Sequence, residues 1–423
     1  MELLTLALYV VSAALAAFVI HRGYPLNMIV LYAMGQTCVR YLLRGGEPLF
    51  PRWTLLLELV QNVIRTVADR YGDAVSRPHY YLKLRRLSAL YGDFIGQFAC
   101  RSYGTEVIPV TVNGLEHIWI KAKASAKTAA AARPKSPSAA TAALQATSAP
   151  KRFVVLYYHG GGYVVLSPRM YIDFCNNLRA AIVKELERTH QVESPQVDFF
   201  LANYRKAPEC KFPIPAQDSV AMYKYLINDQ GLSPRQIILA GDSAGGGLVL
   251  STMLRLRQSQ PGLLPLAAML VCPKTTMGDS SNDDIGRAPH CFLSAKLGKA
   301  FRTAYLKTPD DPSTWQDASP VHCDLRNLPP VFLQAAKLDG IYKESVAITE
   351  KVQADGITNW EIDEHEQMPH IFATLPSFVL PYSQVGVASL AKFAAKQFNS
   401  TLSSSSNTKF LKHKRSSSRV PAA

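Results

Sequence analysis

The stretch with the clearest chemistry is Gly241-Asp242-Ser243-Ala244-Gly245. It follows a strand-like run at 236–240 and precedes a helix-like run at 246–251. A serine between two glycines in a strand–turn–helix context is typical of a nucleophile elbow, which raises the hydroxyl above the end of a sheet. Side chains at the two glycines would collide with the strained turn or its neighbours. The turn also directs the Ala244 N–H toward a developing oxyanion, with a helix N-terminus behind it. For the motif alone, an ordinary glycine-rich turn is the alternative.

A second glycine-rich segment, His159-Gly160-Gly161-Gly162, follows the strand-like run 153–158. It lacks the G-K-[ST] and G-x-G-x-x-G spacings of phosphate-binding loops. Consecutive glycines let backbone N–H groups turn outward, which stabilisation of an oxyanion requires. The segment therefore favours acyl transfer, with a simple glycine turn as the alternative.

These two motifs stand in order with Tyr204-Arg205-Lys206-Ala207-Pro208-Glu209 and Met368-Pro369-His370. Together the four closely resemble the hormone-sensitive-lipase-like branch of the α/β-hydrolases, which includes arylacetamide deacetylases and fungal steryl acetyl hydrolases. The resemblance spans about residues 105–398. It implies an α/β-hydrolase fold, an ester-hydrolysing activity and no metal or organic cofactor.

The resemblance also implies a role for individual residues. Ser243 matches the nucleophile, His370 the general base, and Asp339, in the segment that begins at Pro329, the triad acid. The oxyanion amides are those of Gly161, Gly162 and Ala244, while His159, Gly160 and Asp242 support these motifs.

The histidine and the acid each have a rival. Acyl transfer needs a base within reach of the serine and an acid that orients the imidazole. His365 and His370 both follow Ser243 and Asp339, so either satisfies the order Ser…Asp…His. We favour His370 and expect His365, which lies between two glutamates, to be solvated. Asp363 is the rival acid, while Asp242 is expected to support the elbow rather than to react.

The chain departs from the family pattern at a few positions. Lys206 replaces a leucine, Gly247 an asparagine, Ile371 a glycine, and Gly340-Ile341 a Pro-Leu type pair. None of these changes removes a catalytic atom, but they bear on substrate choice and local packing.

From residue 151 onward, strand-like and helix-like segments alternate, which predicts a mostly parallel sheet flanked by helices. The expected strands are 153–158, 197–201, 236–241, 266–272, 331–336 and 360–363. Before them, residues 105–122 alternate around Asn113-Gly114, the strongest hairpin signal in the chain.

The segment 51–97 has a helical pattern. We expect it to form a cap over the sheet domain, joined by an insertion near 275–320. The apolar residues at helical spacing, expected to pack there, are Leu55, Leu56, Leu59, Val60 and Val63.

An apolar run near the start of the chain predicts a membrane anchor. Leu3–Ile20 holds no charge and is closed by His21-Arg22, at about the minimum length of a spanning helix. Met1-Glu2 offers no basic group, which argues against a signal peptide, and a buried core helix is the remaining alternative. We expect an uncleaved anchor in the endoplasmic reticulum membrane, either single-pass or paired as a hairpin with a second apolar stretch at 25–43. The basic residues that follow favour a cytosolic body, which a hairpin would reverse.

The net charge of +14 does not indicate nucleic-acid binding. The acid-free segments 117–172 and 367–423 carry more Lys and Arg than the whole positive excess. We expect these segments to be solvated, or weakly attracted to an anionic membrane surface. The cysteines are scattered without a C-x-x-C pair, which argues against a zinc site or a disulfide scaffold.

The predicted organisation has four parts. They are an anchor region at 1–45, a helical cap segment at 46–104, an α/β-hydrolase domain at 105–398 and a basic, Ser-rich disordered tail at 399–423. The Ala-, Ser- and Lys-rich insert at 122–150 is expected to be disordered, because it has little apolar surface to bury.

The expected function is that of a membrane-anchored serine carboxylic-ester hydrolase. Its partners would be membrane lipids and a lipophilic ester with a short acyl group, and the resemblance suggests sterol acetates. No nucleic acid and no obligate protein partner is expected. The first alternative is a non-catalytic ligand receptor on the same fold, as in the plant gibberellin receptors, but those lack the histidine found here at His370. The second is a membrane scaffold acting through the basic segments.

Overall fold

A computed structural model describes residues 24–123, 152–189, 195–278, 285 and 288–416. One sheet has the strand order β1-β2-β4-β3-β5-β6-β7-β8. The strands are β1 (Thr105–Val112), β2 (Leu115–Ala122), β3 (Arg152–Tyr158), β4 (Gln196–Ala202), β5 (Ile237–Asp242), β6 (Ala267–Val271), β7 (Val331–Ala336) and β8 (Trp360–His365). Strand β2 pairs antiparallel with β1 and β4, and every other neighbouring pair is parallel. This confirms the mostly parallel sheet.

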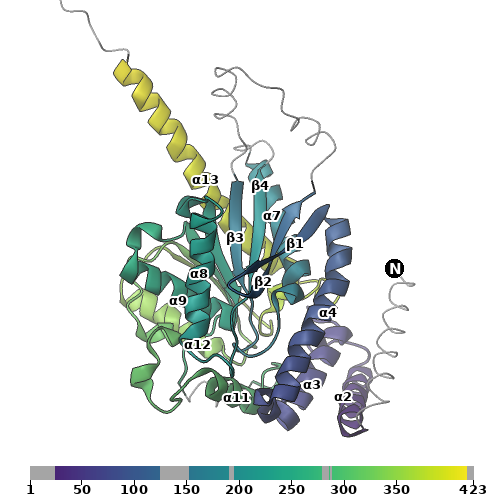
Figure 1. The fold of residues 1–423 in the computed structure, drawn as a ribbon. Coiled ribbons are helices and arrows are strands. Elements are labelled where there is room, and N and C mark those ends of the chain that lie inside the picture. The colour runs from purple at the N-terminus through teal and green to yellow at the C-terminus, as the bar shows by residue number, and fades with distance from the viewer. Residues whose placement is uncertain (1–23, 124–151, 190–194, 279–284, 286–287, 417–423) are drawn as a thin grey trace, which may run out of the picture.

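Helices flank the sheet, with α8, α9 and α12 on one side and α7 and the start of α13 across the other (Figure 1). The helices are α2 (Tyr24–Leu43), α3 (Leu55–Tyr71), α4 (Pro78–Ser102), α7 (Ile172–Arg188), α8 (Ile214–Asn228), α9 (Ala244–Ser259), α11 (Ala295–Tyr305), α12 (Tyr342–Ala354) and α13 (Ser383–Ser416). The 3-10 turns are η1 (Gly72–Ser76), η2 (Pro168–Tyr171), η3 (Pro234–Gln236), η4 (Pro261–Leu263), η5 (Pro312–Thr314), η6 (Gln316–Ala318), η7 (Pro320–His322) and η8 (Phe372–Thr374).

The sheet separates two apolar cores, and β3 shows why. Side chains of a strand alternate between its faces. Val155 and Tyr157 join the core under α7 and α13, while Leu156 and Tyr158 join the core under α8 and α9. All four are fully buried, and each burial stabilises the fold by roughly 1.5–3 kcal/mol. A continuous apolar strand is what a sheet covered on both faces requires.

The predicted hairpin is confirmed. Residues 113 and 114 connect β1 and β2, and both have positive φ, at 50° for Asn113 and 73° for Gly114. This is the backbone of a type I′ turn, for which Asn-Gly is the preferred sequence.

The segment 51–97, predicted to be helical, contains α3 and most of α4. Helix α3 begins at an N-cap, Thr54, whose side chain accepts a hydrogen bond from the Leu57 N–H, and helix α4 begins with Pro78 after η1. The buried side chains of α3 include Leu57 and Glu58, whereas the predicted apolar set is only partly buried. The buried carboxylate of Glu58 pairs with Arg44 at 2.5 Å and accepts the Leu49 N–H at 2.6 Å, which offsets the cost of burying its charge.

Several predicted segments lie at or beyond the edge of the described residues. The anchor at Leu3–Ile20 and nearly all of the insert at 122–150 lie outside them. Within the described part of the chain, no helix combines the length and apolarity that crossing a membrane needs. The second apolar stretch, 25–43, lies in helix α2. The prediction of a disordered tail was wrong for residues 399–416, because α13 continues from the domain through Ser416.

Candidate active site

The elbow that carries Ser243 lies between β5 and α9. Ser243 has φ 50° and ψ −121°, a conformation that costs a non-glycine residue about 1–3 kcal/mol. Backbone hydrogen bonds hold it in place. The Ser243 N–H donates to the Val271 carbonyl at 2.9 Å, and its carbonyl accepts from Lys274 N–H at 2.8 Å and Gly247 N–H at 3.2 Å. The strained turn is therefore built into the end of the sheet.

The two glycines of the motif are needed for close backbone approach. A Cβ placed on Gly245 would collide with the carbonyl oxygen of Tyr158, at the end of β3. A Cβ on Gly241 would lie 2.5 Å from the backbone of Gly245 itself. The structure thus confirms the steric reason for both glycines.

Asp242 ties the elbow to the glycine-rich loop. Its buried carboxylate accepts hydrogen bonds from the Tyr157 hydroxyl at 2.7 Å, the Tyr171 hydroxyl at 2.9 Å and the Gly160 N–H at 2.9 Å. Burial raises the pKa of this carboxyl, and the tyrosine hydrogen bonds act in the opposite direction. These three hydrogen bonds engage both carboxylate oxygens of Asp242 and hold the glycine-rich loop against the elbow.

Two amide groups of the glycine-rich loop have no hydrogen-bond acceptor in the part of the chain that the structure describes. Gly161 has φ 108° and Gly162 has φ 60°, both in the region that favours glycine. The N–H groups of Gly161, Gly162 and Ala244 make no hydrogen bond within the described residues. The first two follow His159, whose Nδ1 lies 2.7 Å from the Gly160 carbonyl. Burial lowers the pKa of His159 well below its usual range, so this ring is neutral.

His370 and Asp339 form a buried pair. Nδ1 of His370 lies 2.7 Å from Oδ2 of Asp339, and the two side chains are only 2% and 1% exposed. The other carboxylate oxygen accepts the Ile341 N–H at 2.9 Å and lies 3.9 Å from the Cys291 thiol. Nε2 of His370 makes no hydrogen bond to any described residue, Ser243 included. An imidazole held at Nδ1 by a carboxylate has Nε2 as its proton acceptor.

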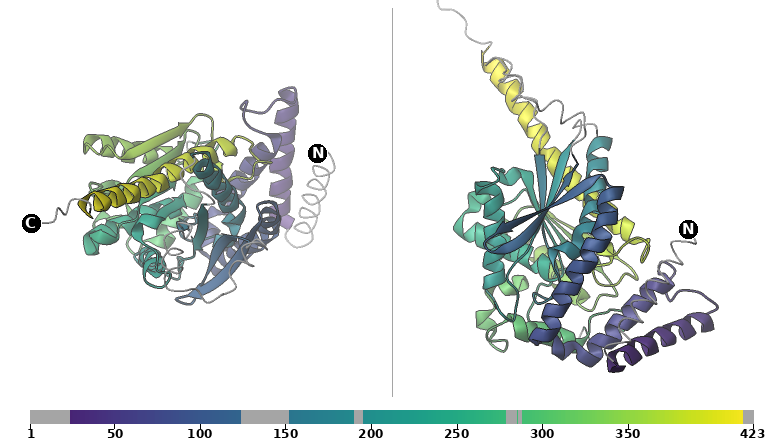
Figure 2. Two further views of the ribbon diagram at one scale, coloured as in Figure 1. Left: turned by 90° about the horizontal axis from the view of Figure 1, so that it is seen from above. Right: turned by 45° about the vertical axis from the view of Figure 1, so that its right-hand side comes forward.

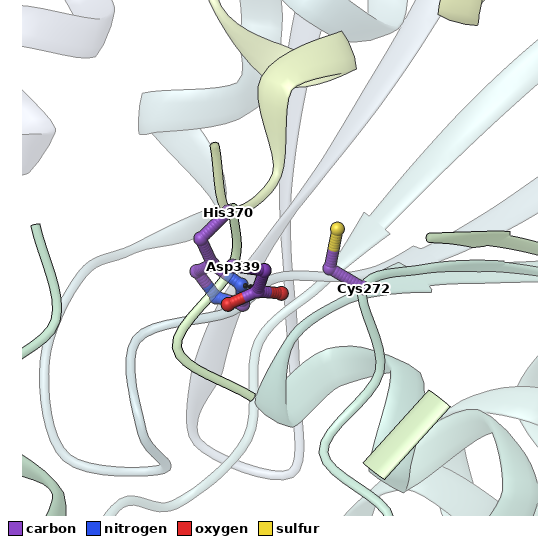
Figure 3. A group of neighbouring side chains, drawn as sticks. All are labelled: Cys272, Asp339 and His370. Carbon is purple, nitrogen blue, oxygen red and sulfur yellow. Dashed lines mark hydrogen bonds and ion pairs between the residues drawn. The ribbon is translucent and has the colours of Figure 1, made fainter. Parts of the chain in front are cut away.

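Cys272 places this pair next to the elbow. It directly follows Val271, the residue whose carbonyl accepts the Ser243 N–H, and its Sγ accepts the Ile371 N–H at 3.4 Å. Figure 3 shows Cys272, Asp339 and His370 together, and their ligand-type atoms lie within 4.8 Å of one another. Burial raises the pKa of the Cys272 thiol well above its usual range, which disfavours the thiolate that a metal ion would need. Sequence reasoning had no signal for either Cys272 or Cys291.

The rival residues pair with each other instead. Nε2 of His365 lies 2.8 Å from Oδ2 of Asp363, and Nδ1 lies 3.2 Å from the Tyr382 hydroxyl. The prediction of a solvated His365 was wrong, because its ring packs against Phe372 and is only 5% exposed. Its glutamate neighbours, Glu364 and Glu366, are exposed and both lie near the Lys337 ammonium instead.

The N-terminal helices reach the loops around this pair. From α3, the Arg65 guanidinium donates to the carbonyls of Ala288, Cys291 and Leu293. Within that loop the Phe292 ring meets the His370 ring edge-on, with centroids 5.6 Å apart. Just before α3, the Trp53 indole N–H donates to the Gln367 carbonyl at 2.6 Å, three residues from His370.

Helix α11 covers the glycine-rich loop. A Cβ on Gly162 would collide with the ring of Phe301, and one on Gly72 of η1 would lie 2.7 Å from the Leu297 backbone. An apolar ring therefore lies at each part of the site, Phe301 at Gly162 and Phe292 at His370.

The structure shows the surroundings of each departure from the family pattern. A Cβ at Gly247 would collide with the Tyr163 hydroxyl, so no larger side chain fits there. Lys206 is buried, its ammonium donates to the Asn203 side-chain oxygen at 2.5 Å, and burial lowers its pKa to about 7. Ile371 has φ 51°, a strained value for a β-branched residue where glycine would be unstrained. Within the Gly340-Ile341 pair, the Ile341 N–H donates to the Asp339 carboxylate.

Comparisons with known proteins agree with this geometry. Residues 155–374, about half of the chain, match the family described as the alpha/beta hydrolase fold. An acetyl-hydrolase of Streptomyces hygroscopicus is 28% identical over 219 residues, which cover 52% of this chain and 67% of that protein. Steryl acetyl hydrolase 1 of Saccharomyces cerevisiae is 27% identical over 124 residues, 28% of this chain and 26% of that protein.

A solved structure extends the likeness over more of the chain. The crystal structure of an esterase from the bacterial hormone-sensitive lipase (HSL) family has a TM-score of 0.58 and 25% identity, and the match covers 81% of this chain and 98% of that one. The chain thus belongs to the α/β-hydrolase fold family, in its hormone-sensitive-lipase-like branch of ester hydrolases.

Proposed function

We propose that the chain is a serine carboxylic-ester hydrolase that works through an acyl-enzyme on Ser243. Nε2 of His370 takes the hydroxyl proton as Oγ attacks the ester carbonyl, and Asp339 stabilises the imidazolium that forms. The amides of Gly161, Gly162 and Ala244 donate to the oxyanion. His370 then protonates the departing alcohol. In the second step His370 takes a proton from a water molecule, which attacks the acyl carbon and releases the acid from Ser243.

The observation that carries this proposal is the His370–Asp339 pair beside the strained serine. Its 2.7 Å contact uses Nδ1, and both side chains are buried. Three amides without a partner among the described residues belong to the two motifs that meet at Asp242. A base, an orienting acid and oxyanion donors are the parts that acyl transfer requires.

The proposed substrates are short-acyl esters of lipophilic alcohols, with sterol acetates as the leading candidates. Phe301 lies directly on Gly162, which leaves little room for a long acyl chain beside that amide. The Phe292 ring at His370 adds an apolar wall that suits an uncharged alcohol. The names of the matched acetyl-hydrolase and steryl acetyl hydrolase point in the same direction.

We also propose that Leu3–Ile20 anchors the protein in a membrane, with the endoplasmic reticulum as its location. The support is the uncharged apolar run of eighteen residues in the sequence. An anchored enzyme would meet a substrate that partitions into the bilayer.

The experiment is hydrolysis of p-nitrophenyl esters from acetate to palmitate by the detergent-solubilised full chain, next to Ser243→Ala. We expect a rate that is highest for short acyl groups and that falls by about 10⁴-fold or more in the variant. A rate that does not depend on Ser243 contradicts the mechanism. If no ester is hydrolysed and a fluorophosphonate probe does not label Ser243, the ligand-receptor alternative replaces it.

A further inference from the structure

Helix α4 exposes an apolar stripe that cannot turn inward. After Tyr81, the buried residues of its inner face are small. A Cβ on Gly92 would collide with the Arg169 backbone, and one on Gly96 would collide with the Ile172 side chain. Arg85 locks the same orientation by donating to the carbonyls of Val164 and Ala207. The outward stripe, spaced by four and three residues, is Tyr80, Leu84, Leu87, Tyr91, Phe94 and Phe98.

Helix α2 buries the polar side chains of Asn27 and Thr37 and exposes most of its large apolar ones. Toward α3, the Asn62 amide donates to the Thr37 hydroxyl at 2.8 Å, and the buried amides of Asn27 and Gln61 have no partner within the described residues. The outward side chains are Leu26, Met28, Leu31, Tyr32, Val39, Leu42 and Leu43, with Leu43 82% exposed. This is the reverse of a helix on a protein surface in water.

These two helices account for most of the apolar surface. Among the described residues, the exposed large apolar side chains lie between positions 26 and 103, with the exceptions of Ile362, Phe378 and Val385. All views in Figures 1 and 2 place α2 and α4 on the flank away from α8 and α9. An apolar surface of this extent marks an interaction site.

We propose that the outer faces of α2 and α4 lie in the surface of an anionic phospholipid bilayer. We call these two sets of outward side chains the bilayer-contact face. The face is distinct from the proposed anchor, because it lies in the described helices and sets the orientation of the catalytic domain.

The charges of the face suit an anionic lipid surface. Helix α2 contains no acidic residue, and the one acid in α4, Asp93, is paired with Arg169. The exposed bases Lys83, Arg86 and Arg101 take part in no ion pair within the described residues. Basic side chains beside an apolar face attract anionic headgroups. A second copy packed on this face would bring like charges together.

The position of the proposed anchor agrees with this orientation. Ile20 precedes Tyr24, the start of α2, by four residues, which span at most about 14 Å. Tyrosine is enriched where proteins meet membrane surfaces. Four tyrosines in or next to α2 and α4 are exposed, at positions 32, 80, 91 and 103.

The face is connected to the catalytic loops through helix α3. Helix α2 packs on α3, and α3 holds the loop of Cys291 and Phe292 through Arg65. An ester dissolved in the bilayer would therefore be near the site, which is the one part of this inference that rests on the proposed function.

The test uses the full chain reconstituted into vesicles of phosphatidylcholine and phosphatidylserine. The photo-crosslinking residue p-benzoylphenylalanine replaces Phe94 in one variant, Leu31 in a second, and Ile362 in a control. Ile362 is also exposed, but it lies on β8, at the other end of the sheet from β1. Mass spectrometry identifies the adducts after irradiation, flotation reports vesicle attachment, and hydrolysis is measured separately.

We expect lipid adducts at positions 94 and 31, with yields many times that at position 362. Three outcomes overturn the proposal. Crosslinks between two chains at position 94 would make the face a homodimer interface. Equal lipid labelling at position 362 would mean that contact is unspecific. A chain that floats with the vesicles and hydrolyses esters, but gives no lipid adduct, would leave the anchor and the enzyme intact and remove the bilayer-contact face.

Discussion

The chain contains two histidine–carboxylate pairs whose histidines are five residues apart. They differ in whether the second imidazole nitrogen also has a hydrogen-bond partner among the described residues. His370 contacts Asp339 through Nδ1 at 2.7 Å, and His365 contacts Asp363 through Nε2 at 2.8 Å. Both histidines are buried. The second nitrogen of His365 meets the Tyr382 hydroxyl, whereas Nε2 of His370 has no partner among the described residues.

The difference shows that a short, buried His–Asp contact does not by itself make a catalytic pair. A general base needs one nitrogen fixed by its acid and the other open toward the nucleophile. Only His370 meets that condition, and Cys272 places it beside the elbow of Ser243. The His365–Asp363 pair instead links β8 to the segment before α13.

The largest expected effect comes from removing each histidine in turn. His370→Ala should lower kcat/KM for p-nitrophenyl acetate by about 10⁴-fold or more, because the base is lost. His365→Ala should leave kcat within a few-fold and lower the free energy of unfolding by about 1–3 kcal/mol, because Asp363 keeps the Gln334 amide but loses the imidazole. Equal losses of activity in the two variants would mean that both pairs take part in the chemistry.

The acids give the second comparison. Asp339→Asn should reduce kcat by roughly 10³- to 10⁴-fold, since an amide stabilises the wrong tautomer of His370. Asp363→Asn is the matched control, and its kcat should stay near that of the wild type. Steady-state kinetics on the two purified variants decides this, and a strong loss in the control would favour Asp363 as the acid.

Much of the fold and of the candidate site could be predicted from local patterns. The alternation of apolar runs gave the parallel strands, and Asn113-Gly114 gave the hairpin. Glycines at 241 and 245 marked a turn with no room for side chains. Each of these signals depends on residues close together in the sequence, which is why it could be read without the structure.

Contacts between distant residues could not be predicted. Burial of His365 depends on Tyr382 and Phe372, and the reach of Arg65 to the carbonyls near Cys291 spans more than two hundred residues. The two thiols beside Asp339 come from segments with no motif of their own. Such contacts are set by how elements pack, and periodicity does not specify them.

A buried lysine, Lys206, titrates near neutral pH, so it affects the pH dependence of stability in any comparison of the two histidine–carboxylate pairs. Lys206 has a folded pKa of about 7 against 10.5 for an ordinary lysine. Between these values the unfolded chain holds a proton that the folded chain has lost, so stability should rise as the pH increases from about 7 toward 10, by a few kcal/mol. Below pH 7 the full penalty of burying the charge remains.

Lys206→Met should remove this pH dependence and make the protein more stable at neutral pH. Urea unfolding of both proteins at about pH 6, 7.5 and 9 measures it. An unchanged slope in the variant would show that Lys206 is not the group that titrates. The activity profile of the variant then reports the catalytic groups without the lysine.

The smallest expected effect comes from removing the second hydrogen-bond partner of His365. Tyr382→Phe removes the hydroxyl that occupies Nδ1 of His365 but keeps the ring that lies under Arg52. The free energy of unfolding should fall by about 1 kcal/mol for the lost hydrogen bond, with kcat unchanged. Thermal unfolding and kinetics check it, and a change in kcat would connect the His365 pair to the site.

The most direct test of the central claim is to map the residue that a fluorophosphonate probe modifies and to time the reaction. In the wild type and in His365→Ala, the adduct should form on Ser243 at similar rates, whereas in His370→Ala it should form far more slowly. An adduct on another residue, or equal rates in the two histidine variants, would contradict the assignment of Ser243 and His370 as nucleophile and base.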